Sequence, residues 1–151
     1  MPPTRTLVCI AYALTAHVAF VGTWSQNVAY FRPDDGLAGF ALATARFWPD
    51  TLTTPASVSV TVDLGLFFLA AALFMVLEAR RLGIRFVWVY VVLGLLVAIS
   101  VTFPLFLIAR ERRLAADGTA TAVGLSSGDA VGLASLGAVA AAFTLWTVVS
   151  G

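Results

Sequence analysis

Residues 60–81 read VTVDLGLFFLAAALFMVLEARR, and this stretch decides the class of fold. A helix of about 20 mostly apolar residues crosses the hydrocarbon core of a bilayer. The run is that long, and the only charged residue in it before Glu78 is Asp63. A carboxylate is costly at such a depth, so Asp63 is expected either to be paired or to be functional. The stretch therefore predicts a membrane-spanning helix that carries a candidate site.

The composition of the whole chain agrees with a membrane protein. Of 151 residues, 60% are hydrophobic and 11% are charged, whereas about 25% of residues in soluble domains are charged. Residues 1–151 are interpreted as a single membrane domain without a soluble module. One histidine and one cysteine cannot build an ordinary zinc or haem site, so no metal and no cofactor are predicted. A net charge of +1 gives no reason to expect a nucleic-acid partner.

Apolar runs predict an all-α integral membrane protein, a four-transmembrane-helix bundle. The predicted spans are residues 6–27, 57–79, 86–109 and 129–149. The second and third spans are joined by only six residues, so they are expected to form an antiparallel hairpin. Between the first two spans, Asp34 and Asp35 precede apolar residues at helical spacing and Pro49 follows them. This pattern predicts a short interfacial helix between the first and second spans.

The arginines indicate the orientation of the predicted bundle in a cell membrane. With four full crossings, one side holds Arg5, Arg80, Arg81 and Arg85. The other side then holds the remaining five arginines, Arg32, Arg46, Arg110, Arg112 and Arg113. The count is nearly balanced, but charges near the first helix and short loops weigh most. We therefore expect a multi-pass protein with both termini in the cytoplasm.

Polar side chains recur at one predicted depth. His17 and Asp63 each lie about two turns, or ~10 Å, from the same end of their helices. A polar layer around Asp63 is predicted from these two and three hydroxyl residues of the later spans, Ser100, Thr102 and Ser135. Polar residues at the end of the first span and just after it, Gln26, Asn27 and Tyr30, would cover this layer. The layer is interpreted either as a site or as glue between helices.

Three further features concern helix packing. Glu78 and Arg81 are three residues apart and are expected to form an ion pair. Pro104 should kink the third span. Small residues recur at every fourth position before and within the last span, at Gly124, Gly128 and Gly132. Such a surface favours close helix contact, either within the bundle or in a homo-oligomer or larger membrane complex.

The central part of the chain resembles a bacterial membrane family catalogued as domain of unknown function 2834. The resemblance covers about residues 24–113 and rests on an ordered set of motifs. The set consists of PAS at 55–57, DL at 63–64, EARRLG at 78–83, Ser100, PLFL at 104–107 and RE at 110–111. The resemblance implies a small helical membrane protein and brings no activity with it. The family's usual pattern has three helices, and this chain adds a fourth.

Three hypotheses for function stay open at this point. The leading one is binding of a lipid-like or hydrophobic small molecule, or of a membrane partner, through the polar layer around Asp63. The second is a membrane enzyme acting on a hydrophobic substrate, such as a proton-initiated isoprenoid cyclase. In that enzyme Asp63 would be the general acid and His17 would hold or reload its proton. The third is a structural subunit that docks through its last helix.

Overall fold

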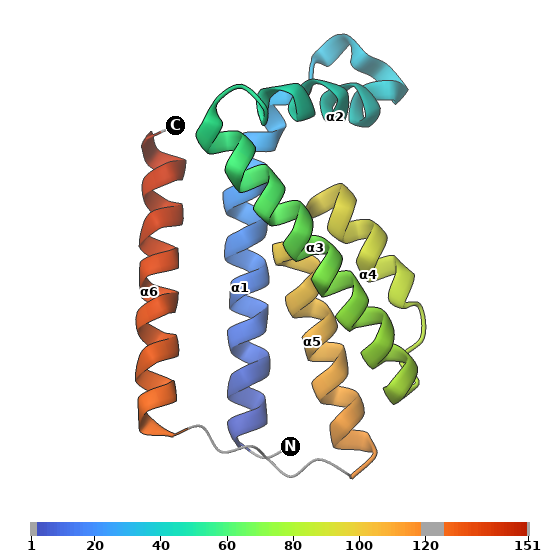
Figure 1. Cartoon of the computed structure of the whole chain (residues 1–151), viewed down its shortest axis with the longest axis vertical. Coiled ribbons are helices and arrows are strands. Elements are labelled where there is room, and N and C mark those ends of the chain that lie inside the picture. Colours follow the sequence, from blue (N-terminus) through green and yellow to red (C-terminus); the bar gives the residue numbers. More distant parts are fainter. Residues whose placement is uncertain (1–2, 119–125, 151) are drawn as a thin grey trace.

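The computed structural model describes residues 3–118 and 126–150, and this part of the chain is almost entirely helical (Figure 1). The α-helices are α1 (Pro3–Asn27), α2 (Gly39–Asp50), α3 (Pro55–Leu82), α4 (Val87–Leu93), α5 (Ile99–Ala116) and α6 (Ser127–Ser150). Two short 3-10 segments, η1 (Val28–Tyr30) and η2 (Pro33–Ala38), precede α2, and a π-helical segment, η3 (Gly94–Ala98), joins α4 to α5. The prediction of an all-α fold is confirmed.

Four helical segments are long and apolar enough to cross a membrane. They are Thr4–Tyr30, Pro55–Leu82, Val87–Ala116 and Ser127–Val149. A short helix, α2, lies between the first and second of them, as the sequence predicts. Figure 1 shows α2 lying across one end of the bundle, roughly perpendicular to α1.

Local sequence signals fix both ends of α3. Thr54 is the N-cap, and its Oγ1 accepts a hydrogen bond from the Ser57 backbone N–H at 3.1 Å. Pro55 fills the first helical position, where its missing N–H costs nothing. At the other end Gly83 adopts a left-handed conformation with φ of 65°, and the Ile84 N–H bonds the Ala79 carbonyl at 2.9 Å. This C-terminal cap of α3 turns the chain toward α4 within a few residues.

The third apolar segment is folded back on itself. Tyr90 of α4 and Phe106 of α5 would lie ~24 Å apart along one straight helix, yet their ring centroids are 5.7 Å apart. The reversal occurs at η3, where Ala98 has the extended backbone angles φ 179° and ψ 139°. Near the other end of the hairpin, Arg113 Nε donates to the Leu82 carbonyl at 2.9 Å. Residues 87–116 therefore form a re-entrant hairpin, not the single crossing predicted for residues 86–109.

This path places the start of α1 and the end of α6 at opposite ends of the bundle (Figure 1). Gly22, near the end of α1, lies against Thr144, near the end of α6, so these helices run parallel. Four full crossings would have made them antiparallel. The expectation that both termini share the cytoplasmic side assumed four full crossings, whereas the hairpin returns the chain to the end from which it entered; which end faces the cytoplasm stays a prediction.

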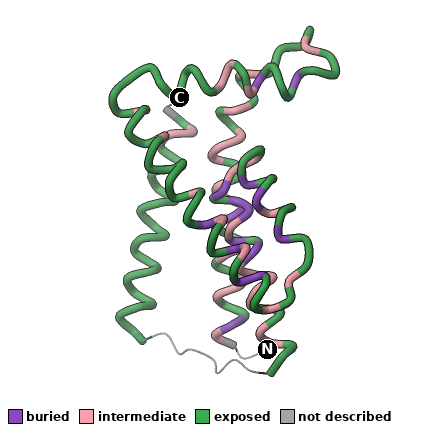
Figure 2. Tube along the Cα trace, turned by 45° about the vertical axis from the view of Figure 1, so that its right-hand side comes forward, coloured by how far each residue is buried: buried purple, intermediate pink, exposed green. Residues whose placement is uncertain are grey.

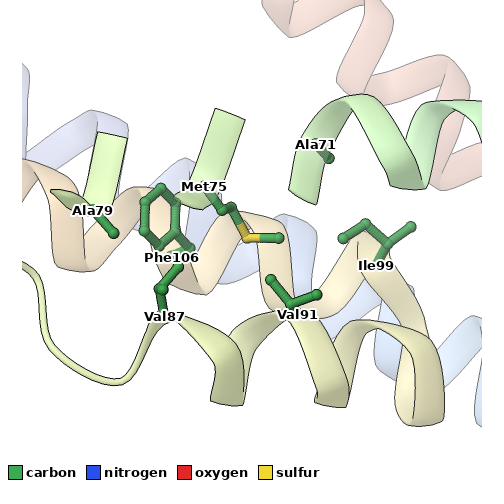
Figure 3. Packing of buried hydrophobic residues seen from close by; sticks show 7 residues of the cluster. All are labelled: Ala71, Met75, Ala79, Val87, Val91, Ile99 and Phe106. Atoms are coloured by element: carbon green, nitrogen blue, oxygen red, sulfur yellow. The ribbon is translucent and has the colours of Figure 1, made fainter. Parts of the chain in front are cut away.

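The buried core lies between α3 and the two arms of the hairpin (Figure 2). Met75 of α3 and Phe106 of α5 are completely buried. Around them pack five smaller side chains, Ala71, Ala79, Val87, Val91 and Ile99 (Figure 3). By contrast α6 is exposed along nearly its whole described length. The buried centre of the molecule is therefore the hairpin held against α3 and α1, with α6 at its periphery.

Candidate functional site

A cavity of about 790 Å³ lies beneath the cap, which we define as residues 28–54. Four parts of the chain line it: the last turns of α1, the cap, the first half of α3 and the tip of the hairpin. Its wall includes the aromatic residues Trp24, Tyr30, Phe31, Phe40, Phe47, Trp48 and Phe68. Its polar lining includes Thr23, Asn27, Thr44, Thr51, Thr54, Ser57, Thr61 and Ser100. Among the described residues that line it, none is charged, so the cavity is apolar with neutral hydrogen-bonding groups.

An ion pair braces the cap internally. Arg46 of α2 donates from Nη1 and Nη2 to the two carboxylate oxygens of Asp35, at 2.6 and 2.7 Å. Arg46 Nη1 also donates to the Tyr30 carbonyl at 3.0 Å. The hydrogen bonds from Arg46 hold the pKa of the Asp35 carboxyl at about 2, against partial desolvation that raises it. This bidentate pair closes the loop between η1 and α2 and so fixes the internal fold of the cap.

Tyr30 connects the cap to the cavity wall. Its hydroxyl donates to Asp50 Oδ2 at 2.9 Å, and its ring packs edge to face on Phe47 with centroids 5.6 Å apart. Phe47 in turn lies 5.6 Å from Trp48. Aromatic pairs of this geometry add stability beyond the area they bury. The cap side of the cavity is therefore a set of interlocked aromatic rings.

The tip of the hairpin forms another wall of the cavity and depends on Gly94. A Cβ built on Gly94 would lie 2.8 Å from Thr102 Oγ1 and 3.3 Å from the Phe68 ring. Only a residue without a side chain fits this approach of the two arms. Thr102 Oγ1 donates a long hydrogen bond of 3.5 Å to the Ala98 carbonyl at the reversal. The reversal thus brings residues 94–100 into the cavity lining.

The residues predicted for the site divide into two groups. Asn27, Tyr30 and Ser100 line the cavity. The other five, His17, Gln26, Asp63, Thr102 and Ser135, do not line it. Thr102 is buried between the arms of the hairpin, and the other four are exposed on helix surfaces.

Asp63 and His17 are not brought together. Within residues 3–118 and 126–150, neither side chain makes a hydrogen bond or an ion pair. Residues Thr61, Leu64, Gly65 and Phe68 line the cavity and recur on one face of α3. Asp63 lies off this face. The predicted roles of Asp63 and His17 stay predictions.

Sequence reasoning missed an ion-pair network at the opposite end of the bundle. The predicted pair is confirmed, since Arg81 donates to Glu78 at 2.6 and 2.7 Å. Arg110 of α5 donates to the same carboxylate at 2.7 Å and to Glu111 at 2.8 Å. Arg5 of α1 lies 3.3 Å from Glu111. The network ties α1, α3 and α5 together, and the only sequence signal for it was an excess of arginine near the ends of apolar runs.

The fold and the cavity define a class: a small helical membrane protein with a re-entrant hairpin and a capped, uncharged cavity. The family described as protein of unknown function DUF2834 matches residues 11–112, and the chain belongs to this family. The matched region contains the whole cavity and ends before α6. No curated protein and no solved structure matches the chain.

Proposed function

We propose that this protein binds an uncharged, lipid-like molecule in the cavity beneath the cap. The observation that supports it is the match between size and chemistry. A volume of about 790 Å³ lies within the ~300–1,000 Å³ typical of small-molecule sites. Aromatic and aliphatic groups dominate the lining, and its polar groups are neutral. An ionic headgroup would find no counter-ion there, whereas a carbonyl or hydroxyl group would find hydrogen-bonding partners.

Neutral polar groups at two places in the cavity orient the bound molecule. Asn27 and Tyr30 stand on the cap side, where a polar headgroup can bond the amide of Asn27. Leu64 and Phe68 continue along α3 toward the hairpin tip and suit an apolar chain. At the tip, Ser100 offers a second hydroxyl for a longer molecule with a polar group at its far end.

The charge distribution supports an orientation in the cell membrane. We define the arginine end as the end of the bundle with the N-terminus of α1, the turn between α3 and α4, and the end of α5. It holds seven of the nine arginines, Arg5, Arg80, Arg81, Arg85, Arg110, Arg112 and Arg113. Because arginine-rich flanks stay in the cytoplasm, the arginine end is the cytoplasmic one. The cap and the end of α6 then face the opposite compartment.

A substitution that fills the cavity tests the proposal. Gly65 lines the cavity, and a Cβ built on it meets no atom within 4 Å, so the side chain of Gly65→Leu starts in open space. The matched control is Gly132→Leu on α6, where a Cβ also meets nothing within 4 Å. Both proteins are purified in mild detergent, and their co-purified hydrophobic molecules are identified by mass spectrometry.

We expect a molecule that is retained by the wild type and by Gly132→Leu and is lost from Gly65→Leu. Asn27→Leu should weaken its retention, because the headgroup loses its amide partner. A wild-type protein that carries no hydrophobic molecule, and takes up none from bacterial lipid extract, would overturn the proposal. Equal retention by Gly65→Leu and the wild type would overturn it as well.

A further inference from the structure

A second hollow, of about 710 Å³, lies at the arginine end, far along α5 from the cavity beneath the cap. We call it the basal groove. One side is the turn between α3 and α4 together with Tyr90, and the other side is the last three turns of α5. Three arginines line it, Arg85, Arg112 and Arg113. Its remaining lining is apolar or small apart from the hydroxyl of Tyr90, and includes Leu105 and Ile108.

Arginines of the basal groove retain positive charge that the fold does not neutralise. Within the described residues, neither Arg85 nor Arg112 forms an ion pair or a hydrogen bond with an acid. Arg85 instead lies 5.7 Å from the centre of the Phe86 ring. Arg113 donates to the Leu82 carbonyl and is 3.7 Å from Asp117. Glu78 and Glu111 are already engaged by other arginines, Arg5, Arg81 and Arg110.

Charged and apolar residues of the groove are separated by depth. Arg112 lies seven residues beyond Leu105 on α5, which is ~10 Å along the helix axis. Leu105 and Ile108 are therefore nearer the membrane centre, while the arginines stand at the interface. Phospholipids have the same order, with an anionic phosphate at the interface and acyl chains below it. A free anion would contact only the part of the groove that the arginines line.

We propose that the basal groove binds one anionic phospholipid of the cytoplasmic leaflet. Its phosphate lies among Arg85, Arg112 and Arg113, and an acyl chain lies along Leu105, Ile108 and the ring of Tyr90. Basic pockets between helices on the cytoplasmic side suit such headgroups. Guanidinium groups suit them further, because each can donate two parallel hydrogen bonds to phosphate oxygens.

Arginines at this end would also be expected if they only kept the end on the cytoplasmic side of the membrane. Arg80 distinguishes this explanation from a lipid site. Arg80 lies at the same end and is exposed, and within the described residues it forms no ion pair. It does not line the basal groove. A purely topological role makes Arg80 equivalent to Arg85 and Arg112, whereas a lipid site does not.

Native mass spectrometry of the full-length protein tests the proposal. The protein is released from nanodiscs of phosphatidylcholine that contain a small fraction of phosphatidylglycerol. We expect one phosphatidylglycerol to stay bound and phosphatidylcholine to be lost. Arg85→Gln and Arg112→Gln should each weaken phosphatidylglycerol retention about fivefold, and Arg80→Gln should leave it unchanged.

Several results would overturn the proposal. Equal retention of the two lipids by the wild type is one, and this comparison needs no variant to fold. Equal loss in Arg80→Gln and Arg112→Gln is another, because it would indicate charge attraction without a site. Glycerol phosphate that displaces the lipid at equal concentration would show that the apolar half of the groove contributes nothing.

Discussion

Tyr90 and Phe106 pack edge to face with ring centroids 5.7 Å apart, although η3 and parts of two helices separate them in sequence. This contact is possible only because the chain reverses at Ala98. It decides which residues share an end of the molecule. Arg110, Arg112 and Arg113 join the N-terminus of α1, and the cap is left with Arg32 and Arg46.

The hairpin predicts which positions are accessible from the same side of the membrane. In a Cys9→Ser background, single cysteines replace Asp34 in the cap, Arg80 after α3 and Ala116 at the end of α5. We expect Arg80→Cys and Ala116→Cys to react with an impermeant maleimide from one side, and Asp34→Cys from the other. A straight third helix would instead group position 116 with position 34, and that labelling pattern would refute the hairpin.

Glu78 is expected to stabilise the arginine end. Glu78→Gln removes the carboxylate that Arg81 and Arg110 share, and Glu78 is only 8% exposed. The cost should be about 1–3 kcal/mol in the free energy of unfolding, below the 3–5 kcal/mol of a fully buried pair. The reason for the lower value is that the Arg81 side chain is 63% exposed.

Unfolding in mixed micelles measures this cost, and Asp117→Asn is the control. Its partner Arg113 lies at 3.7 Å, with side-chain exposures of 48% and 38%, so the change should cost less than about 1 kcal/mol. Equal effects of the two substitutions would show that the network contributes no more than a surface pair.

Gly22 is expected to set the distance between α1 and α6. A Cβ at this position would lie 2.6 Å from Thr144 Cγ2. The Thr144 hydroxyl donates to the Ala140 carbonyl at 2.8 Å, which restrains its rotamer. Gly22→Ala should therefore destabilise the protein by about 1–3 kcal/mol through overpacking, despite the higher helix propensity of alanine.

A double mutant tests the cause of that destabilisation. Thr144→Ser removes Cγ2 and keeps the hydroxyl, so it should restore stability to Gly22→Ala. Gly137→Ala, where a Cβ meets nothing within 4 Å, should be neutral or stabilising. If Thr144→Ser failed to rescue Gly22→Ala, the parallel packing of α1 and α6 would be in doubt.

Stability of the cap is expected to depend on pH through Asp35. Its folded-state pKa is lowered from 3.8 to about 2 by Arg46. A carboxyl whose pKa is lower in the folded than in the unfolded protein stabilises the folded state at pH values above its unfolded-state pKa. This stabilisation is lost as the pH falls through the folded-state pKa. The difference in melting temperature between wild type and Asp35→Asn should be constant above pH ~5, shrink from pH ~4 and vanish below pH ~2.

Asp34→Asn is the control for that pH profile. Asp34 is exposed and, within the described residues, makes no hydrogen bond or ion pair. The melting temperature of Asp34→Asn should match that of the wild type at every pH. A difference for Asp35→Asn that persisted unchanged at pH 2 would mean that the ion pair with Arg46 does not cause it.

Much of the fold could be predicted from the sequence because it depends on composition and local signals. The apolar runs, the interfacial helix and the Glu78–Arg81 pair are all readable within a few helical turns. The hairpin could not be predicted in this way, because an apolar run of this length is equally compatible with one straight membrane-spanning helix. Gly94 and Pro104 were the only local signs of irregular helix in residues 86–109, and the reversal falls between them at Ala98.

The candidate site was harder to predict, because depth along a helix says nothing about the direction a side chain faces. Asn27, Tyr30 and Ser100 were expected in or over one polar layer around Asp63, and in the structure they line a common cavity that Asp63 does not line. His17 and Asp63 were expected at the same depth, but both are exposed and neither lines the cavity. The Asp35–Arg46 pair joins residues three helical turns apart across an irregular loop, which no periodicity reveals. Gly128 and Gly132 meet little or nothing on α6, and Gly124 lies outside the described residues.

Because α1 and α6 run parallel, the last helix decides at which end of the bundle the described chain finishes. Up to residue 116 the chain runs the length of the bundle twice, in α1 and in α3, and the hairpin returns to its starting end, so α1 begins and α5 ends at the arginine end. Helix α6 runs the length of the bundle once more, so it ends on the side of the cap. A domain fused after α6 would be delivered to the compartment that the cap faces, while the same domain fused before α1 would stay on the arginine side. The matched family region ends at residue 112, so the helix that returns the chain to the cap's end of the bundle lies outside it.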